Sequence, residues 1–516
     1  MTGHAGYRPL VRAALGGAVA AAVAIGLSEL LAGLVPGAPS LVVAVGQAII
    51  DLQPPGAKDV VVALFGEADK LALEILIVAA ALAIAAGLGL LARRSLPLAA
   101  LGFAAAAGLG WLAALRDART DPTLAAVSAA VAGAAAIWAL SWLMRDGSTP
   151  SPLGRTAAVT MPDWSRRGFL TRSGALAVGA VAAGALGRSL LEDQRRSTAL
   201  AQATLPHPNQ VATLPPGAEL TVDGLTPLVV PNADFYRIDT ALLVPNVDLA
   251  SWRLRIHGMV DRETTLTFDQ LVSLGTFEQY VTIACVSNLV GGKLVGNAKW
   301  TGVRLRDVLD IAGVQPGATQ LVGRSVDNWT AGMPTAWVMD PAREPMVAVA
   351  MNDAPLPIAH GFPVRLIVPG LFGYVSATKW LKELELTTLE AFDAYWVPLG
   401  WAKEGPILTQ SRIDVPRAGV RLAAGRVTIA GVAWAPDRGI SRVEVAVDGD
   451  WREASISTPI SDATWVQWRI DWDATPGDHA ISVRATDGRG EVQTAARSDP
   501  APDGARGHHT IIVSVS

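Results

Sequence analysis

The chain of 516 residues contains a single cysteine, Cys285, and only seven histidines. One cysteine excludes an internal disulfide framework and any zinc or iron–sulfur site that needs several cysteines. The net charge of −4 gives no basic field that would attract nucleic acid. No histidine lies in the long apolar runs of the first 150 residues, which argues against a bis-histidine haem among them.

What is abundant is apolar sequence, with 51% hydrophobic residues and a mean hydropathy of +0.34. The average hides two populations. Residues 1–200 are rich in Ala, Leu, Val and Gly and carry few charges, whereas residues 205–516 have the mixed composition of a soluble protein. The sequence therefore predicts a helical transmembrane region followed by soluble domains.

Four apolar runs before residue 150 are long enough to cross a bilayer as helices. They lie at about 10–35, 71–92, 96–115 and 122–144. Two shorter apolar pieces, Leu41–Leu52 and Val60–Phe65, are too brief to span and are interpreted as interfacial or re-entrant helices. We predict a four-helix transmembrane region over residues 1–150.

The basic residues of the short loops predict the orientation of these helices. Three pairs fall on one side, with Arg116 and Arg119 as exceptions accompanied by Asp117 and Asp121. The three pairs are Arg8 and Arg12, Arg93 and Arg94, and Arg145 and Arg155. This distribution favours a cytoplasmic N-terminus and a multi-pass protein of the cell membrane.

Residues 165–171 read Ser-Arg-Arg-Gly-Phe-Leu-Thr and precede a weakly apolar run over 174–191. This segment resembles the twin-arginine export signal, whose alternative is a basic flank of an ordinary helix. An Ala-x-Ala at 199–201 leaves cleavage open, but we favour retention of 151–200 as a fifth transmembrane helix. Twin-arginine export carries folded proteins, so we expect an extracytoplasmic soluble half that folds around a cofactor made in the cytoplasm.

The soluble half divides into three predicted parts. Residues 201–230 are polar and rich in proline, as in a linker. Residues 231–405 mix strand and helix patterns, which predicts an α+β domain. Residues 406–516 contain short alternating strands separated by Asp-Gly and Pro-Gly turns, typical of an immunoglobulin-like β-sandwich. Such a module either mediates dimerisation or partner binding, or acts as a stabilising lid on the catalytic domain.

Cys285 is predicted at the end of a buried strand over 279–286, before a loop that contains Gly291 and Gly292. A free cysteine in this position is often an inert core residue. Other segments of the same domain add a guanidinium, an imidazole, a lysine and glycine turns, a combination suited to an anionic cofactor with a soft metal. The segments are Pro231–Arg237, Ala298–Val303, His360–Gly370, Gly373–Tyr374 and Thr378–Trp380.

In this order, the segments resemble the sulfite oxidase family of molybdopterin-dependent oxidoreductases, over about residues 225–516. The similarity is greater to bacterial members without a cytochrome domain, and residues 406–516 resemble the family's dimerisation domain. The resemblance implies a Mo-molybdopterin cofactor, a small-molecule substrate and a possible homodimer. It also implies an external electron carrier or the quinone pool as redox partner, because no haem or iron–sulfur site is evident.

The resemblance assigns roles to nine residues. Cys285 is expected to be the thiolate ligand of molybdenum, and Arg237 is expected to orient the substrate as a catalytic residue. The expected cofactor contacts are Tyr236, Arg237, Ser325, His360, Arg365, Ala377, Thr378 and Lys379. Trp300 is interpreted as core more readily than as a substrate contact.

The sequence departs from the family after the cysteine, where sulfite oxidases place an arginine and this chain has Leu289 and Val290. Arg237, Lys293 and Arg324 are the remaining candidates for cations near the substrate. Three hypotheses follow: an oxidase of a sulfur or similar oxyanion, a sulfoxide or oxyanion reductase, and a membrane-tethered binding protein without catalysis. The chemistry expected of the first two is two-electron oxygen-atom transfer.

Overall fold

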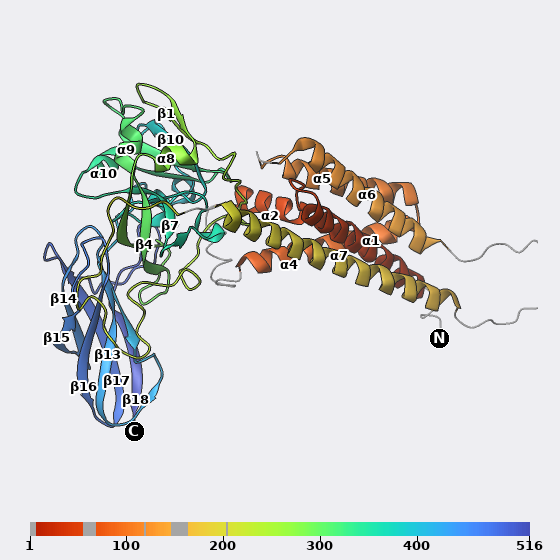
Figure 1. Ribbon diagram of the computed structural model, residues 1–516. Coiled ribbons are helices and arrows are strands. Elements are labelled where there is room, and N and C mark those ends of the chain that lie inside the picture. The colour runs from red at the N-terminus through yellow and green to blue at the C-terminus, as the bar shows by residue number, and fades with distance from the viewer. Residues whose placement is uncertain (1–6, 55–68, 118–119, 146–163, 203–204) are drawn as a thin grey trace, which may run out of the picture. The chain divides into compact units, whose positions relative to one another are not determined.

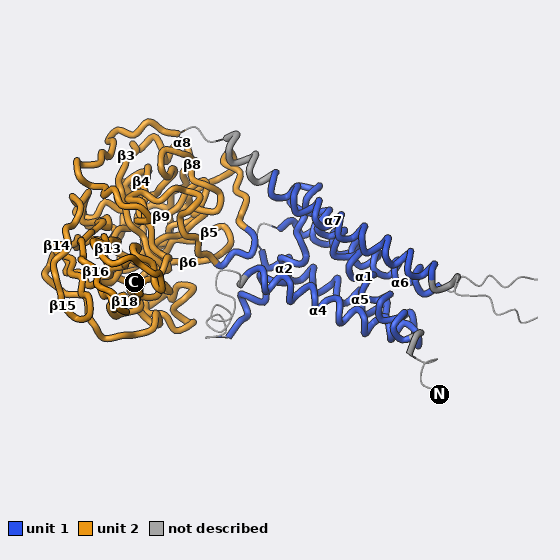
Figure 2. Tube along the Cα trace, turned by 90° about the horizontal axis from the view of Figure 1, so that it is seen from below, with its two compact units in different colours: residues 1–197, 240–243 blue, residues 198–239, 244–516 orange. Residues whose placement is uncertain are grey.

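The computed structural model describes residues 7–54, 69–117, 120–145, 164–202 and 205–516. The chain divides into two compact units (Figure 2). Unit 1 comprises residues 1–197 together with 240–243, and unit 2 comprises 198–239 together with 244–516.

Unit 1 is a bundle of helices (Figure 1). Its helices are α1 (Tyr7–Leu34), α2 (Leu41–Leu52), α4 (Asp69–Ala92), α5 (Leu96–Ala114), α6 (Pro122–Met144) and α7 (Trp164–Gln202). Within the described residues, all of these except α2 are long and apolar enough to cross a membrane. The predicted helices therefore form where the apolar runs lie, and α2 matches the first short apolar piece. The second piece, Val60–Phe65, lies outside the described residues.

Glycines let the helices of unit 1 approach closely, as is common between helices in lipid. A Cβ atom at Gly17 of α1 would collide with the backbone of α4 at Ala85, and one at Gly89 would collide with Ala13. These pairs make α1 and α4 antiparallel. Gly26 and Gly33 of α1 meet Ala180 and Gly187 of α7 in the same way, in ascending order along both helices. Helices α1 and α7 therefore run in the same direction, as the predicted alternation of spans requires.

A buried ionic cluster interrupts the apolar interior of unit 1. The Glu29 side chain accepts from Ser40 Oγ at 2.5 Å and from Arg188 Nε at 2.7 Å. Arg188 also pairs with Glu74 at 3.2 Å. Glu29 is only 4% exposed, and its partners compensate the buried charge. The cluster ties α7 to α1 and α4.

Unit 2 contains two five-stranded sheets that position the candidate site. One has the order β2-β1-β10-β5-β6, and the other has the order β3-β4-β7-β8 with β9 paired to β7. The first sheet consists of β1 (Leu254–Gly258), β2 (Thr264–Leu266), β5 (Gln320–Ser325), β6 (Thr330–Pro334) and β10 (Leu381–Thr387). The second consists of β3 (Thr276–Ala284), β4 (Val295–Arg304), β7 (Met346–Met351), β8 (Ala354–Pro355) and β9 (Arg365–Ile367). This mixture of strands and short helices has the predicted α+β character.

Short helices connect these strands, and their ends follow local chemistry. They are α8 (Phe268–Val272), α9 (Leu305–Asp310), α10 (Thr335–Met339), α11 (Gly373–Ser376), η2 (Ile358–His360) and η3 (Val397–Leu399). Thr267 and Gln270 form a capping box at the start of α8. Helix α9 begins only at Leu305, because Val303 pairs with Val347 in the sheet.

Residues 205–230, predicted as a linker, lack helices and longer strands but pack against unit 2. Ala218 and Leu228 are 2% and 1% exposed and belong to its main hydrophobic core. Asn297 donates a hydrogen bond to the Leu228 carbonyl at 2.9 Å. The proline-rich composition predicted the irregular backbone, but it could not show that the apolar residues of the segment are buried.

The C-terminal region is an eight-stranded sheet of order β11-β13-β16-β15-β14-β17-β18-β12. Its strands are β11 (Gln410–Val415), β12 (Arg421–Leu422), β13 (Gly425–Trp434), β14 (Ile440–Val447), β15 (Asp450–Ile456), β16 (Val466–Ala474), β17 (Gly477–Asp487) and β18 (His509–Val515). Strand β15 pairs with both β14 and β16, and residues from both halves share one hydrophobic core. The sheet therefore curls around its own core, and the immunoglobulin-like assignment stays a prediction.

Candidate active site

Cys285 follows the last residue of β3 and is partly exposed. Its N–H donates to the Leu294 carbonyl at 2.9 Å, and its own carbonyl accepts from the Asn288 N–H at 3.1 Å. Two backbone bonds thus hold the cysteine at the start of the loop that connects β3 to β4. This is the strand-end position predicted from the sequence.

Tyr236 lies within electrostatic range of both this thiol and Arg365. Burial raises the pKa of the Tyr236 phenol, the neighbouring Cys285 raises it further, and Arg365 opposes both effects. The Tyr236 ring stacks on Phe235 with 5.3 Å between ring centroids, and Phe235 meets Trp300 edge to face at 5.9 Å. An aromatic cluster therefore fixes the phenol beside the cysteine.

Arg365, on β9, is a buried cation with only neutral partners. It is 3% exposed. Its Nη1 donates to the His360 carbonyl at 3.1 Å, and its guanidinium lies 5.0 Å from the centre of the Trp300 ring. Burial lowers the pKa of Arg365 to about 10. Among the described residues no carboxylate pairs with it, so this desolvated charge favours the binding of an external anion.

His360 ends η2 and is 5% exposed. Its Nε2 lies 3.2 Å from the Asn232 carbonyl, so the neutral ring carries its proton on Nε2. Burial, followed by the charges of Arg365 and Lys379, lowers the pKa of His360 to about 4. The imidazole is therefore neutral at physiological pH and acts as a hydrogen-bonding group.

Asp239 joins two of the predicted cations. Lys379 Nζ lies 2.8 Å from the Asp239 carboxylate and 3.1 Å from the Ala359 carbonyl. Arg237 Nε lies 2.9 Å from the same carboxylate. Burial lowers the pKa of Lys379 to about 8, although Asp239 acts to raise it. The sequence reasoning missed Asp239, and its only local signal was a carboxylate two residues after Arg237.

The remaining predicted contacts serve the backbone around these groups. Ala377 is the C-cap of α11, and Thr378 is fully buried with its carbonyl accepting from the Leu366 N–H at 2.9 Å. Both residues hold Lys379 next to β9. Ser325, at the end of β5, is 1% exposed and accepts a long bond of 3.4 Å from the Asp327 N–H in its own turn.

Six of the predicted residues are thus linked by contacts or electrostatic effects. These are Cys285, Tyr236, Arg365, His360, Lys379 and Arg237. Trp300 is fully buried, as predicted for a core residue, and also supports Arg365. Lys293 is exposed in the loop after Cys285.

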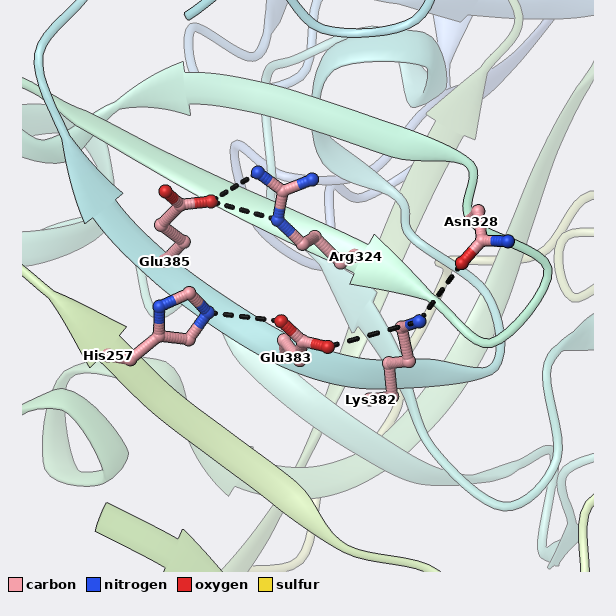
Figure 3. A pocket seen from close by; sticks show the side chains of 6 residues that line it. All are labelled: His257, Arg324, Asn328, Lys382, Glu383 and Glu385. Carbon is pink, nitrogen blue, oxygen red and sulfur yellow. Dashed lines mark hydrogen bonds and ion pairs between the residues drawn. The ribbon is translucent and has the colours of Figure 1, made fainter. Parts of the chain in front are cut away.

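Arg324, a candidate cation, is engaged in a different pocket (Figure 3). It binds Glu385 and lies 4.9 Å from the centre of the Phe392 ring. The pocket has a volume of about 360 Å³ and is lined by His257, Arg324, Asn328, Lys382, Glu383 and Glu385. His257 contacts Glu383 at 3.1 Å. The two carboxylates of this pocket pair with Arg324 and Lys382 and balance their charges.

Comparison with known proteins agrees with this chemistry. Residues 241–396 match the family model described as "Oxidoreductase molybdopterin binding domain". The region is a molybdopterin-binding domain. It includes Cys285, Ser325, His360, Arg365 and 377–379, whereas Tyr236 and Arg237 lie just before it. The match to residues 241–396 supports an oxidoreductase that binds a Mo-molybdopterin cofactor.

Sulfite oxidases, nitrate reductases and a sulfane dehydrogenase are among the proteins that resemble the chain. Mitochondrial sulfite oxidase of Homo sapiens is 30% identical over 316 residues, which cover 52% of this chain and 57% of that protein. Nitrate reductase [NADH] 1 of Oryza sativa subsp. japonica is 28% identical over 357 residues, covering 57% and 38%. The sulfane dehydrogenase SoxCD of Paracoccus pantotrophus has a TM-score of 0.49 at 23% identity, covering 59% of this chain and 88% of that chain.

The residues of the site fit such a cofactor. Arg365 offers a buried positive charge without a carboxylate partner in the described residues, and Lys379 offers a second cation. Cys285 lies at the start of the β3–β4 loop. Its thiolate form is a suitable ligand for a soft or high-valent metal. The donor set thus combines anion binding with metal ligation.

Proposed function

We propose that the chain is a membrane-anchored molybdenum oxidoreductase that resembles sulfite oxidase. Its reaction is a two-electron oxygen-atom transfer on a small extracytoplasmic molecule. The observation that carries the proposal is Arg365, a cation 3% exposed that acts on Tyr236, as Cys285 also does. Within the described residues, its hydrogen bonds go to the carbonyls of Leu366 and His360. A buried guanidinium of this kind favours the binding of an anion from outside the chain.

The residues of the site divide the work of holding the cofactor. Cys285 ligates the metal, while Arg365 and Lys379 neutralise the phosphate of the pterin. Tyr236 and His360 contribute hydrogen bonds, because burial keeps the phenol protonated and the imidazole neutral. The remaining predicted contacts, Ser325, Ala377 and Thr378, shape the backbone. When bound, the cofactor supplies the two-electron redox chemistry.

Arg237 is the proposed substrate-orienting residue. Its side chain is 38% exposed and pairs with Asp239, which leaves part of the guanidinium facing solvent. An oxidase of a sulfur or related oxyanion would use this charge to bind its substrate. The first hypothesis from the sequence is therefore kept as the main proposal.

A second candidate is a sulfoxide or oxyanion reductase on the same scaffold. It is favoured by Leu289, which is 60% exposed in the loop after Cys285. It is also favoured by Asp239, because this carboxylate offsets the charges of both Arg237 and Lys379. A neutral substrate with an apolar part suits such a site better than a small dianion does.

Membrane anchoring and export complete the proposal. Helices α1 and α7 run in the same direction, so a cytoplasmic N-terminus would direct the chain after α7 to the outside. Arg166 and Arg167 lie in the first turn of α7, where a twin-arginine signal would be read. The ionic cluster of Glu29, Arg188 and Glu74 supports retention of this helix.

We also propose that the C-terminal sheet is an immunoglobulin-like domain used for homodimerisation. Electrons would pass to an external carrier or the quinone pool. Side-by-side assays test the direction of the reaction. We expect the purified full chain to oxidise sulfite with an artificial acceptor. Turnover of methionine sulfoxide with a reduced dye, and none of sulfite, would instead establish the reductase.

A further inference from the structure

Arg412 connects the C-terminal sheet to the loop that follows Cys285. It lies on β11 and is 7% exposed. Its Nη1 donates to the Gly292 carbonyl at 2.8 Å, its Nη2 to Thr226 Oγ1 at 2.8 Å, and its Nε to Asp414 at 2.6 Å. Three short bonds from one planar guanidinium fix its orientation, so the position of Gly292 is defined by the C-terminal sheet.

His509 holds the neighbouring glycine of the same loop. Gly291 has φ of +77°, and a Cβ atom added there would overlap the His509 ring. The ring therefore packs directly on the loop backbone. His509 Nδ1 accepts from the Ile413 N–H at 3.0 Å, which links β18, where His509 is the first residue, to β11. Arg412 and His509 act on consecutive residues from adjoining parts of one sheet.

The strand before Cys285 is held from the same side. Thr282 is fully buried in β3. Its N–H donates to the Ala463 carbonyl at 2.9 Å, and its Oγ1 accepts from the Trp465 N–H at 2.8 Å. The C-terminal region thus contacts the chain on both sides of the cysteine, three residues before it and six to seven residues after it.

We propose that Arg412 and His509 are positioning residues that hold the loop after Cys285 so that its thiol keeps one place in the site. The proposal rests on the proposed function only in assigning Cys285 as a metal ligand. A metal-ligating residue on a loop needs contacts that fix its orientation, because an unsupported loop samples many conformations. The C-terminal sheet then contributes to the site as well as to any dimer.

The single cysteine permits a test that does not require the cofactor. The rate of alkylation of Cys285 by iodoacetamide is measured in the full-length, cofactor-free chain. Arg412→Ala and His509→Ala are compared with Arg426→Ala and His479→Ala. The two control residues form ion pairs in the same sheet with Asp471 and Asp448, both at 2.7 Å. We expect Arg412→Ala and His509→Ala to raise the alkylation rate of Cys285 by roughly fivefold or more, because the loop opens more often.

The loaded enzyme supplies a second readout. In the same two variants we expect kcat to fall on the order of tenfold to a hundredfold with little change in KM. The electron paramagnetic resonance signal of half-reduced molybdenum should also shift. Arg412→Lys keeps one hydrogen-bond donor and His509→Gln keeps one acceptor, so we expect values of kcat between those of the wild type and the alanine variants. These two variants replace the alanine variants if the latter do not fold.

Alkylation rates and spectra equal to those of the controls would overturn the proposal. Absence of molybdenum from the wild-type chain would refute the proposed function instead. The alkylation comparison would still decide whether the C-terminal sheet holds the loop.

Discussion

The Lys379 ammonium donates to the Asp239 carboxylate across 2.8 Å, and this pair sets the charge of the lysine. Burial lowers the pKa of Lys379 to about 8, and Asp239 opposes part of this fall. A lysine is charged below its pKa, so its attraction for an anionic cofactor is present below pH 8 and weakens above it. The carboxylate thus keeps the lysine charged at physiological pH.

Asp239→Asn should therefore make cofactor retention more sensitive to pH. Without the carboxylate, the pKa of Lys379 falls further, and the side chain becomes neutral at a lower pH. We expect retained pterin near the wild-type level at pH 6.5 and a clear loss at pH 8, measured by pterin fluorescence after gel filtration. Asp393→Asn, which breaks the exposed pair with Lys403, is the control. Equal retention by both variants at pH 8 would refute this role.

Arg365→Met should separate stability from cofactor binding. Removing a buried charge that pairs with no carboxylate in the described part of the chain should stabilise the cofactor-free chain, raising Tm by about 2–4 °C for each kcal/mol gained. The same variant should lose bound pterin and molybdenum. Arg304→Met is the matched control, because Arg304 also lies over an aromatic ring, Phe277, but pairs with Glu344 at 2.6 Å. A fall in Tm as large as that of the control would show that Arg365 is a structural residue.

His360 should make the folded chain sensitive to acid. Its pKa is lowered from 6.5 to about 4, so the folded state binds fewer protons than the unfolded state between these values. Its contribution to stability is complete above pH 6.5 and is lost as the pH falls towards 4. Thermal unfolding at several pH values should show a smaller loss in this window for His360→Gln.

For His479→Gln we expect a change in the pH dependence of stability of the opposite sign. Asp448 raises the pKa of His479, so the stability that His479 contributes is present below pH 6.5 and is lost as the pH rises. The account of His360 would be contradicted if the dependence of Tm on pH were unchanged in His360→Gln while it changed as expected in His479→Gln.

Substitution of both arginines of the export motif, Arg166→Lys with Arg167→Lys, should leave the soluble part in the cytoplasm. Twin-arginine signals are recognised by an export machinery, so replacing both arginines by lysines is sufficient to disrupt them even though the charge is kept. Protease added to intact spheroplasts should then fail to digest the region after residue 205, while the wild-type region is digested. Digestion of both would contradict the export hypothesis.

Local patterns in the sequence predicted the parts of the structure that depend on neighbouring residues. Apolar runs predicted all five long helices, and the β-branched segment before Cys285 predicted the buried strand whose end carries the thiol. His360 and Arg365 were proposed because their segment resembles one of the sulfite oxidase family, and the structure places them beside each other. Each of these features is encoded within about 20 consecutive positions.

The features that escaped prediction are pairings between distant segments. Asp239 binds Lys379 across 140 positions, and Arg412 binds Gly292 across 120. No periodicity or composition reveals such partners, because they meet only when sheets pack. Glu29 and Arg188 were also missed, since single charges do not alter the apolar average of a helix. The pairing of Arg324 with Glu385 was missed for the same reason, as Glu385 lies on another strand.

The most direct test of the central claim is the molybdenum and pterin content of the purified full chain, measured with Cys285→Ser in parallel. The account predicts one molybdenum and one pterin for each wild-type chain. In Cys285→Ser it predicts loss of turnover and of the spectroscopic signature of the thiolate–molybdenum bond. A wild-type chain without molybdenum and pterin, or full turnover by Cys285→Ser, would contradict it.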